Sequence, residues 1–342
     1  MRKYAGVLAL ALLWMGAGAM IAMAQEKVPD PVAWAYGFVT PGPNPVAPPC
    51  TPETKPHDCS RPGRPWPEDG KPLHLPGSHL TFTISQVQSF WAPADWFPSE
   101  HPPAPDIVKY GNEKEHLRAC GHCHYFNGQG KPENAGLAGL PLNYILQQLA
   151  LFKSGGRKPA DPRKANANEM TQIARFLTDK QIQEAAEYYS SLKWKPWVKV
   201  VESDTAPKTR QSPAGMFLGL AGGETEPLGE RVIEVPQNTN LTERLRDPHS
   251  GFIAYVPVGS IAKGKNIVTT GGGKTVACTT CHGEDLQGMG DIPPIAGRTL
   301  SYTMRQLYNF QQGTRKSPIM EPVVKKLTTD DLISIVAYLG SL

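Results

Sequence analysis

Apolar residues recur at helical spacing in two parts of the chain, each directly after a threonine that can cap a helix. One part follows Thr178, and the other follows Thr328 or Thr329 near the C-terminal end. The apolar faces are Ile182, Ala185, Ala186 and Tyr189 in the first, and Leu332, Ile335, Val336 and Leu339 in the second. Two more helices are predicted at 143–153 and 301–311, so both parts are expected to be mainly helical.

These helices belong to a duplicated segment. From Cys120 to Lys158, landmark residues find an identical or similar residue 158 positions later, and from Met170 onward the offset becomes 150. An eight-residue insertion in the first copy, around 160–167, explains the change. The chain is therefore predicted to contain two copies of one small helical domain, at 106–196 and 260–342.

Two other regions lack the helical pattern. Residues 25–105 are rich in proline, which excludes long helices and central strands, yet they contain aromatic residues such as Trp34 and Phe90 that need burial. We predict an ordered, loop-rich extension that wraps the first helical domain. Residues 197–259 contain short β-like runs and are predicted to form a small β-rich connector, more readily a spacer than a docking surface.

The first 24 residues have the features of a signal peptide. Arg2 and Lys3 precede a long apolar run, and Ala22-Met23-Ala24 matches a signal-peptidase site. A cleaved signal peptide at 1–24 predicts a periplasmic protein. The rival interpretation is an uncleaved anchor, because the apolar run approaches the length that spans a bilayer. Membrane association would then come from this segment or from a partner.

Charge and cysteine content narrow the function further. The formal net charge of +4 on 342 residues gives no basic footprint of the kind that nucleic-acid binding needs. Of six cysteines, Cys50 and Cys59 lie close together in the sequence. We predict a disulfide between them in an oxidising compartment, and two free thiols are the alternative.

The other four cysteines occur in two Cys-x-x-Cys-His sequences at equivalent positions of the repeat. This is the attachment signature of c-type haem, in which two thiols bind the haem and the adjacent histidine binds its iron. The assigned residues are Cys120, Cys123 and His124 in the first copy, and Cys278, Cys281 and His282 in the second. A thioredoxin-like dithiol would need a βαβ pattern, and a zinc ribbon would need closer spacing.

The sixth iron ligand is predicted to be methionine in both copies. The first copy holds only Met170, whereas the second holds Met289, Met304 and Met320. The repeat pairs Met320 with Met170, and it places Met304 opposite Leu146 on the middle helix, where a core role suits it better. We therefore predict His/Met coordination at both irons. The alternative is an apolar methionine beside the haem.

The surroundings of the motifs suggest further roles. The carbonyl of Pro293 can accept the Nδ1 proton of His282, and Ala135 occupies the corresponding position for His124. His122 lies between the two cysteines of the first motif, so we predict a surface residue near the haem edge and not a ligand.

Two arginines and two tyrosines also occupy matched positions in the copies. Arg157 and Arg315 are predicted to pair with haem propionates, and Tyr144 and Tyr302 to pack at the haem edge. Solvated arginine is the alternative for the two cations.

Together the two motifs, the Leu/Ile-Ala-Gly sequences, the distal methionines and the terminal helices resemble class I cytochrome c domains. The tandem arrangement resembles the two-haem bacterial cytochromes c, over about 106–195 and 260–342. The resemblance implies a mainly α fold, two haem c groups and electron transfer.

It also implies redox protein partners. A carrier, or the cytochrome subunit of a complex, would take single electrons from a periplasmic dehydrogenase and pass them to a terminal oxidase or another cytochrome. Six-coordinate irons leave no open position for a substrate, which argues against an enzyme. The alternatives are a two-haem peroxidase or sulfur-compound oxidoreductase, and a structural subunit that anchors a dehydrogenase.

Overall fold

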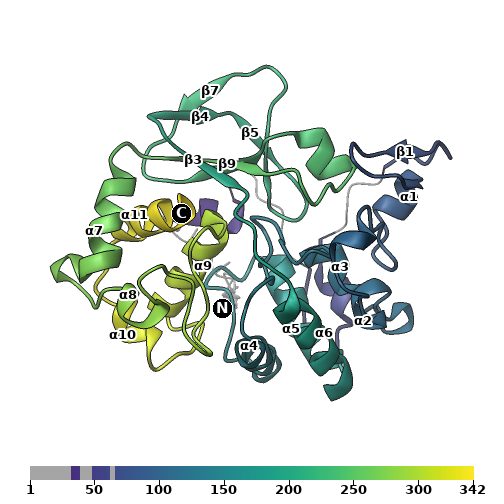
Figure 1. Cartoon of the computed structure of the whole chain (residues 1–342), viewed down its shortest axis with the longest axis horizontal. Coiled ribbons are helices and arrows are strands. Elements are labelled where there is room, and N and C mark those ends of the chain that lie inside the picture. Colours follow the sequence, from purple (N-terminus) through teal and green to yellow (C-terminus); the bar gives the residue numbers. More distant parts are fainter. Residues whose placement is uncertain (1–31, 39–47, 62–65) are drawn as a thin grey trace, which may run out of the picture.

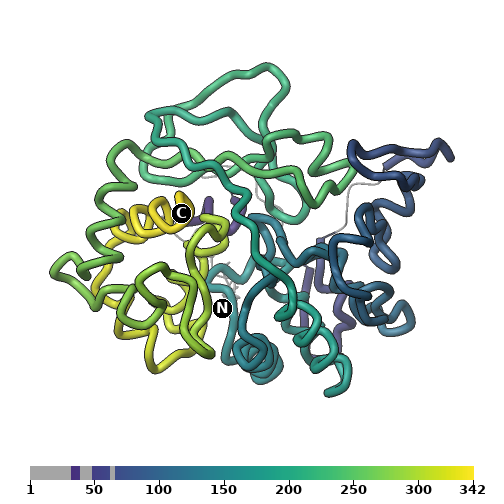
Figure 2. The backbone as a smooth tube through the Cα atoms, in the orientation of Figure 1, coloured from purple at the N-terminus to yellow at the C-terminus, as the bar shows by residue number. Residues whose placement is uncertain are grey.

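The computed structural model describes residues 32–38, 48–61 and 66–342. The predicted signal peptide, residues 1–24, lies outside these ranges. Two helical units lie side by side, and a layer of strands runs along one edge of both (Figure 1). Figure 2 follows the chain from the first unit through the strand layer into the second unit, where it ends. None of the described helices combines the length and apolar character needed to cross a membrane.

The first helical unit is built around three long helices. Its elements are α2 (Asp106–Lys109), the 3-10 turn η4 (Glu113–Glu115), α3 (Cys120–His124), α4 (Leu142–Ser154), α5 (Ala165–Phe176) and α6 (Asp179–Ser191). Helices α4 and α6 agree with the sequence prediction, whereas α5 begins inside the predicted insertion. Helix α4 packs against α5 and α6 through an apolar core that includes Ile145, Leu149 and Ala186.

The second helical unit repeats this arrangement with a shorter penultimate helix. Its elements are α7 (Ser260–Thr270), the 3-10 turn η6 (Gly271–Gly273), α8 (Thr279–His282), α9 (Leu300–Gln311), α10 (Met320–Val324) and α11 (Thr329–Gly340). Helix α7 lies directly against α11. A Cβ atom on Gly264 of α7 would lie 1.9 Å from the carbonyl oxygen of Ser334, so only glycine permits this close approach.

Both terminal helices begin with a capping box, as their threonines predict. The Thr178 side chain accepts a hydrogen bond from the backbone N–H of Gln181, whose side chain accepts one from the backbone of Thr178. Thr328 and Asp331 form the same reciprocal pair at the start of α11. Thr328, and not its neighbour Thr329, is therefore the N-cap of α11.

The strand layer comes from the segment between the two helical units. Its strands are β3 (Val198–Glu202), β4 (Thr205–Pro207), β5 (Thr209–Gln211), β6 (Phe217–Gly219), β7 (Thr225–Pro227), β8 (Ile233–Pro236) and β9 (Phe252–Val256), with a π-helical turn η5 (Asn240–Arg244). Strand β9 is central, parallel to β3 and antiparallel to β8. Glu234 of β8 accepts hydrogen bonds from the backbone of Leu300 and Ser301, so the sheet holds the start of α9.

The described part of the extension before the first unit consists of short elements joined by loops. They are η1 (Ala33–Tyr36), η2 (Pro56–Cys59), β1 (Leu73–His74), β2 (Thr81–Phe82), α1 (Ile84–Val87) and η3 (Pro98–Glu100). Cys50 and Cys59 form a disulfide, which confirms the predicted pairing. The loop that they close packs against α5.

The extension contacts both helical units, and not only the unit that follows it. Residues 32–38 belong to the apolar core of the second unit. The Tyr36 hydroxyl donates to the side-chain oxygen of Asn309 at 2.5 Å, and Arg305 of α9 donates to the carbonyl of Ala35 at 2.6 Å.

Candidate haem sites

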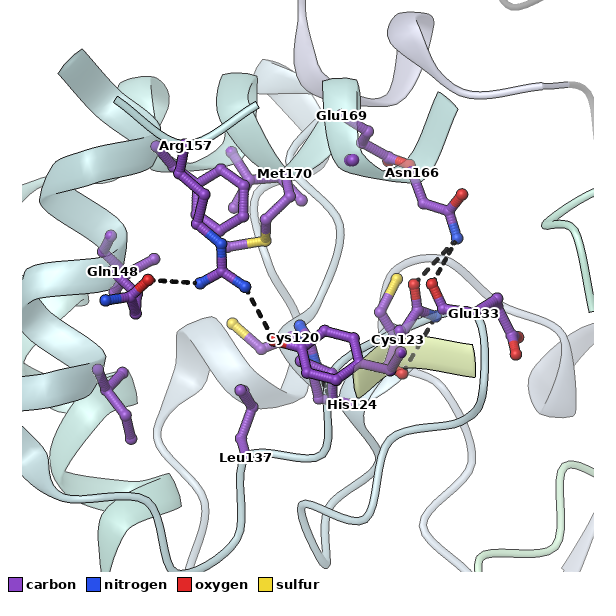
Figure 3. A pocket seen from close by; sticks show the side chains of 18 of the residues that line it. Cys120, Cys123, His124, Glu133, Leu137, Gln148, Arg157, Asn166, Glu169 and Met170 are labelled. Atoms are coloured by element: carbon purple, nitrogen blue, oxygen red, sulfur yellow. Dashed lines mark hydrogen bonds between the residues drawn. The ribbon is translucent and has the colours of Figure 1, made fainter. Parts of the chain in front are cut away.

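The first site is a cavity between α3 and α5. Cys120, Cys123 and His124 line it from α3, and Met170 reaches into it from α5 on the opposite side (Figure 3). A haem c with His/Met ligation uses two thiols for covalent attachment, and an imidazole and a thioether as its iron ligands. The chemistry of this donor set therefore fits the predicted group.

His124 is oriented by a backbone carbonyl. Its Nδ1 atom lies 2.8 Å from the carbonyl oxygen of Ala135, which can only accept, so Nδ1 carries the proton and Nε2 keeps its lone pair. Burial lowers the pKa of His124 to about 4, which favours the neutral ring that binds a metal. The predicted role of the Ala135 carbonyl is confirmed.

The second site repeats this geometry. His282 ends α8, and its Nδ1 atom lies 2.8 Å from the carbonyl oxygen of Pro293. Burial lowers the pKa of His282 as well. The predicted role of the Pro293 carbonyl is confirmed, and the two copies present their histidines in the same way.

The methionines of the second copy have distinct environments. Met304 is fully buried in the apolar core, which confirms its predicted core role, and Met289 is 50 % exposed. Met320 is partly buried at the start of α10. Its assignment as an iron ligand stays a prediction, as does that of Met170.

Comparison with known proteins agrees with this geometry. The family model "Cytochrome c" matches residues 112–193 and 261–342. Cytochrome c-554(548) of Halomonas halodenitrificans is 32 % identical over 72 residues, which are 20 % of this chain and 87 % of that protein. The chain belongs to the cytochrome c family. It binds two haem c groups, one in each of the two matched segments.

Two further proteins are similar to this cytochrome over different lengths. It is 24 % identical over 230 residues to cytochrome c4 of Pseudomonas aeruginosa. This match covers 65 % of this chain and 83 % of that protein. It is 36 % identical over 85 residues to a thiosulfate dehydrogenase electron acceptor of Stutzerimonas stutzeri (strain A1501), 24 % of this chain. That second match spans only 39 % of the relative's length.

His122 of this cytochrome is buried, so its predicted surface position is wrong. Only 7 % of the residue is exposed. Its Nδ1 atom lies 2.8 Å from the carbonyl oxygen of Ser89, its ring packs edge-on to Phe90, and Arg246 donates to its carbonyl. The reason is the extension, which covers this side of the first haem motif.

The matched arginines connect the two cytochrome c domains. Arg157 donates to the hydroxyl of Tyr302 at 2.8 Å and to Gln306 at 3.0 Å, while Arg315 donates to Tyr144 at 2.8 Å. The backbones of Arg157 and Arg315 also pair with each other, as an isolated antiparallel β-bridge between the domains. Each arginine thus reaches the tyrosine of the other domain, an arrangement that the linear repeat does not reveal.

These two guanidinium groups are buried without an ion pair. Arg157 also donates to Gln148, and Arg315 donates to Gln148 and Gln306, so their side-chain partners in the described part of the chain are neutral. Burying a cation without a counter-charge is costly. The two sites therefore suit an anionic partner such as the propionates of bound haem.

Several buried charged residues near the first site escaped the sequence analysis. Glu169 precedes Met170 on α5 and pairs with Arg118 at 2.8 Å, and Lys164 donates to the carbonyl of Ala214. Burial raises the pKa of Glu169 to about 7, against the opposing effect of Arg118. No sequence signal marks these residues, because their partners come from distant segments.

Proposed function

We propose that this cytochrome exchanges single electrons with protein partners in the periplasm, without turning over a substrate. His124 and Met170 would hold the first iron, and His282 and Met320 the second. The observation that carries the proposal is the convergence of two thiols, an imidazole and a thioether on one cavity. The bound haem supplies the one-electron redox chemistry, and the protein supplies its ligands and their orientation.

Methionine ligation has two functional consequences. A sixth protein ligand leaves no open position for peroxide or a sulfur compound, which favours a carrier over an enzyme. A thioether ligand also raises the reduction potential relative to a second histidine. Both effects suit a protein that accepts electrons from a dehydrogenase.

The buried arginines fit the same proposal. We assign Arg157 and Arg315 to the haem propionates, with Tyr144 and Tyr302 beside them. Support comes from the absence of any carboxylate ion pair for the two cations within the described residues.

The partners are proposed from chemistry and similarity. A periplasmic dehydrogenase is the donor that we favour, because one relative is named as an electron acceptor for thiosulfate dehydrogenase. A terminal oxidase or another cytochrome would be the acceptor. We propose residues 1–24 as the signal that directs the chain to this compartment.

Spectroscopy of the oxidised protein tests the ligand assignment. Wild-type protein should show two low-spin irons, each with a methionine-to-iron charge-transfer band. Met170→Ala and Met320→Ala should each remove about half of that absorbance and lower one reduction potential. Met289→Ala, at an exposed position of the second domain, is the matched control and should change neither.

Two results would contradict the proposal. An unchanged band in Met170→Ala or Met320→Ala would remove that residue from the ligand set. A high-spin haem in wild-type protein that binds cyanide readily would indicate an open iron position and favour an enzyme.

A further inference from the structure

A further cavity, which we call the side cavity, adjoins the first haem site. It has a volume of about 180 Å³, which is room for several water molecules or for one small oxyanion. Cys123, Glu133 and Glu169 line both the side cavity and the haem cavity. His124 and Met170 line the haem cavity and not the side cavity. The two cavities therefore share a wall at one thiol of the first haem motif.

The side cavity lies away from the residues that we assign to the haem propionates. Figure 3 shows Cys123 and Glu133 on one side of the haem cavity and Gln148 on the other. Gln148 accepts a hydrogen bond from Arg157, one of the two buried arginines that join the domains. With the propionates at Arg157, as we propose, the haem presents its opposite edge to the side cavity.

Three separate parts of the chain contribute cationic side chains to the lining of the side cavity. Arg61 comes from the extension, Arg118 and Lys131 come from the first domain, and Arg246 comes from the connector. Gln88 and Arg246 are partly exposed, so solvent can reach the cavity. The fold therefore gathers these cations, which are far apart in the sequence, around one small and accessible space.

Two of these cations, Arg61 and Arg246, form no ion pair with any described residue. Arg61 is only 9 % exposed and donates to the carbonyl of Arg163. Within the same part of the chain, its Nε atom has no hydrogen-bond partner. Arg246 donates to the carbonyl of His122 and lies over the ring of Tyr125. Because burying a cation such as Arg61 without a counter-charge is costly, this lining suits an anion.

The carboxylates that line the side cavity do not neutralise these two cations, because each is paired with another one. The pairs are Glu169 with Arg118 at 2.8 Å, Glu133 with Lys131 at 2.9 Å, and Glu243 with Arg210, which lies outside the lining. The lining therefore keeps a positive charge, carried by Arg61 and Arg246. A cleft lined by one sign of charge raises the local concentration of ions of the opposite sign.

The second domain carries apolar residues where the first domain supplies cations to this lining. The repeat pairs Arg118 with Val276 and Lys131 with Met289, and both apolar side chains are exposed. Arg246, which completes the lining from the connector, contacts His122 inside the first haem motif. The cationic side cavity therefore belongs to the first haem site, and an ion bound in it would act on the first haem.

We propose that the side cavity binds a small oxyanion, which lowers the reduction potential of the first haem. Guanidinium groups such as those of Arg61 and Arg246 suit an oxyanion, because each offers several N–H donors in one plane. A negative charge beside Cys123 stabilises the oxidised iron, which carries one more positive charge than the reduced iron. By linkage, the oxyanion binds more tightly to the oxidised protein. Binding itself goes beyond the proposed electron-transfer function, whereas the effect on the potential rests on it.

Titration calorimetry of the oxidised holo protein, with both haems bound, tests the binding step. Inorganic phosphate and sulfate, each added at low ionic strength, should bind as a single ion per chain. Arg246→Gln removes a charged donor and should weaken this binding about tenfold or more. Arg244→Gln is the matched control, because it removes the same charge two residues away and outside the lining. It should change the affinity less than about twofold.

Voltammetry gives a second readout, at the haem itself. Phosphate should lower only one of the two reduction potentials, namely the one that Met170→Ala also lowers. Binding that is tenfold tighter to the oxidised protein corresponds to a shift of about 59 mV at saturation. Arg246→Gln should abolish this shift, while the absorption spectrum of both haems stays that of wild type.

Three results would overturn the proposal. They are the absence of phosphate and sulfate binding to the wild-type holo protein, an equal loss of affinity in Arg244→Gln and Arg246→Gln, and a phosphate effect on both reduction potentials or on neither. If Arg246→Gln does not fold, the two wild-type titrations still decide. Failure of the electron-transfer function would instead appear in the wild-type spectrum, as a haem that is not low-spin, and calorimetry would report the anion independently of it.

Discussion

The terminal helices α6 and α11 differ in one capping side chain, which is a carboxylate only in α11. Asp331 is fully buried, caps α11 with Thr328, and pairs with Lys274 at 2.6 Å and Lys263 at 3.2 Å. Although burial raises the pKa of Asp331, the hydrogen bonds from Lys274 and Thr328 outweigh it and hold that pKa well below its usual value. The repeat places neutral Gln181 at the same position of α6.

This difference predicts that acid destabilises the second domain through Asp331. A carboxyl whose pKa is depressed by folding stabilises the protein above its unfolded pKa, about 4, and this contribution is lost as pH falls further. Asp331→Asn should lower the free energy of unfolding by about 2 kcal/mol at pH 7. It should also flatten the dependence of stability on pH below about 4. Guanidinium denaturation followed by circular dichroism from neutral to acid pH measures both.

The matched control is the first-domain cap. Gln181→Ala should cost about 1 kcal/mol at every pH, because no titrating group is removed. If Asp331→Asn kept the wild-type pH dependence, the ion pairs with Lys263 and Lys274 would not be the source of acid sensitivity.

Individual residues differ in how well the sequence predicts them. The hydrogen bonds from His124 and His282 to backbone carbonyls were predictable, because the repeat aligns both acceptors a fixed distance after the motif. The burial of His122 was not predictable, since Ser89 covers it from a segment with no periodic pattern. Hydrogen bonds close to a motif can be predicted from residue spacing, whereas burial by a loop that is distant in the sequence cannot.

At the scale of elements, helix α5 is hydrogen-bonded to a segment outside its own domain. Met170 faces the haem cavity, while Gln172 donates to the Thr51 carbonyl at 2.7 Å within the disulfide loop. The corresponding helix α10 is hydrogen-bonded within its own domain, because Gln311 of α9 donates to the carbonyls of Val324 and Leu327. The described part of the extension therefore hydrogen-bonds directly to the helix of the first methionine.

This asymmetry predicts that Gln172→Leu weakens only the first iron–methionine bond. Losing a buried hydrogen bond should cost about 1 to 2 kcal/mol, so the bond should break at a lower guanidinium concentration. A Met320→Ala background leaves one methionine-to-iron band, which then reports the first site alone. Gln311→Leu in the same background is the control and should leave that band unchanged, whereas an equal shift in both variants would refute the assignment.

Helices with an apolar stripe were predictable, and α5 was not. The α4, α6, α9 and α11 helices match their predicted segments because their apolar residues recur at helical spacing. The α5 sequence is mostly polar, and its buried face includes Glu169 and Gln172. Gln172 finds its partner, the Thr51 carbonyl, in the extension, and Glu169 pairs with Arg118, so the signal for this helix is spread over distant parts of the chain.

At the scale of the whole molecule, reciprocal polar contacts join the domains. The backbone N–H of Lys158 donates to the carbonyl of Thr314 at 2.9 Å, and that of Lys316 donates to Gly156 at 2.8 Å. Gln306 lies at the centre, because it accepts from both Arg157 and Arg315 at 3.0 Å. Gln306 and Gln148 thus each accept from two buried cations, one from each domain.

Gln306→Leu should therefore uncouple the domains as well as destabilise them. Leucine keeps the volume but leaves both guanidinium groups short of an acceptor, at a cost of about 2 kcal/mol or more. Calorimetry should show one unfolding transition for the wild-type protein and two for Gln306→Leu, since each domain would then melt with its own stability. Gln312→Leu, at an exposed position just beyond α9, should keep the single transition. A single transition in Gln306→Leu with a control-sized shift would mean that the strand layer and residues 32–38 couple the domains.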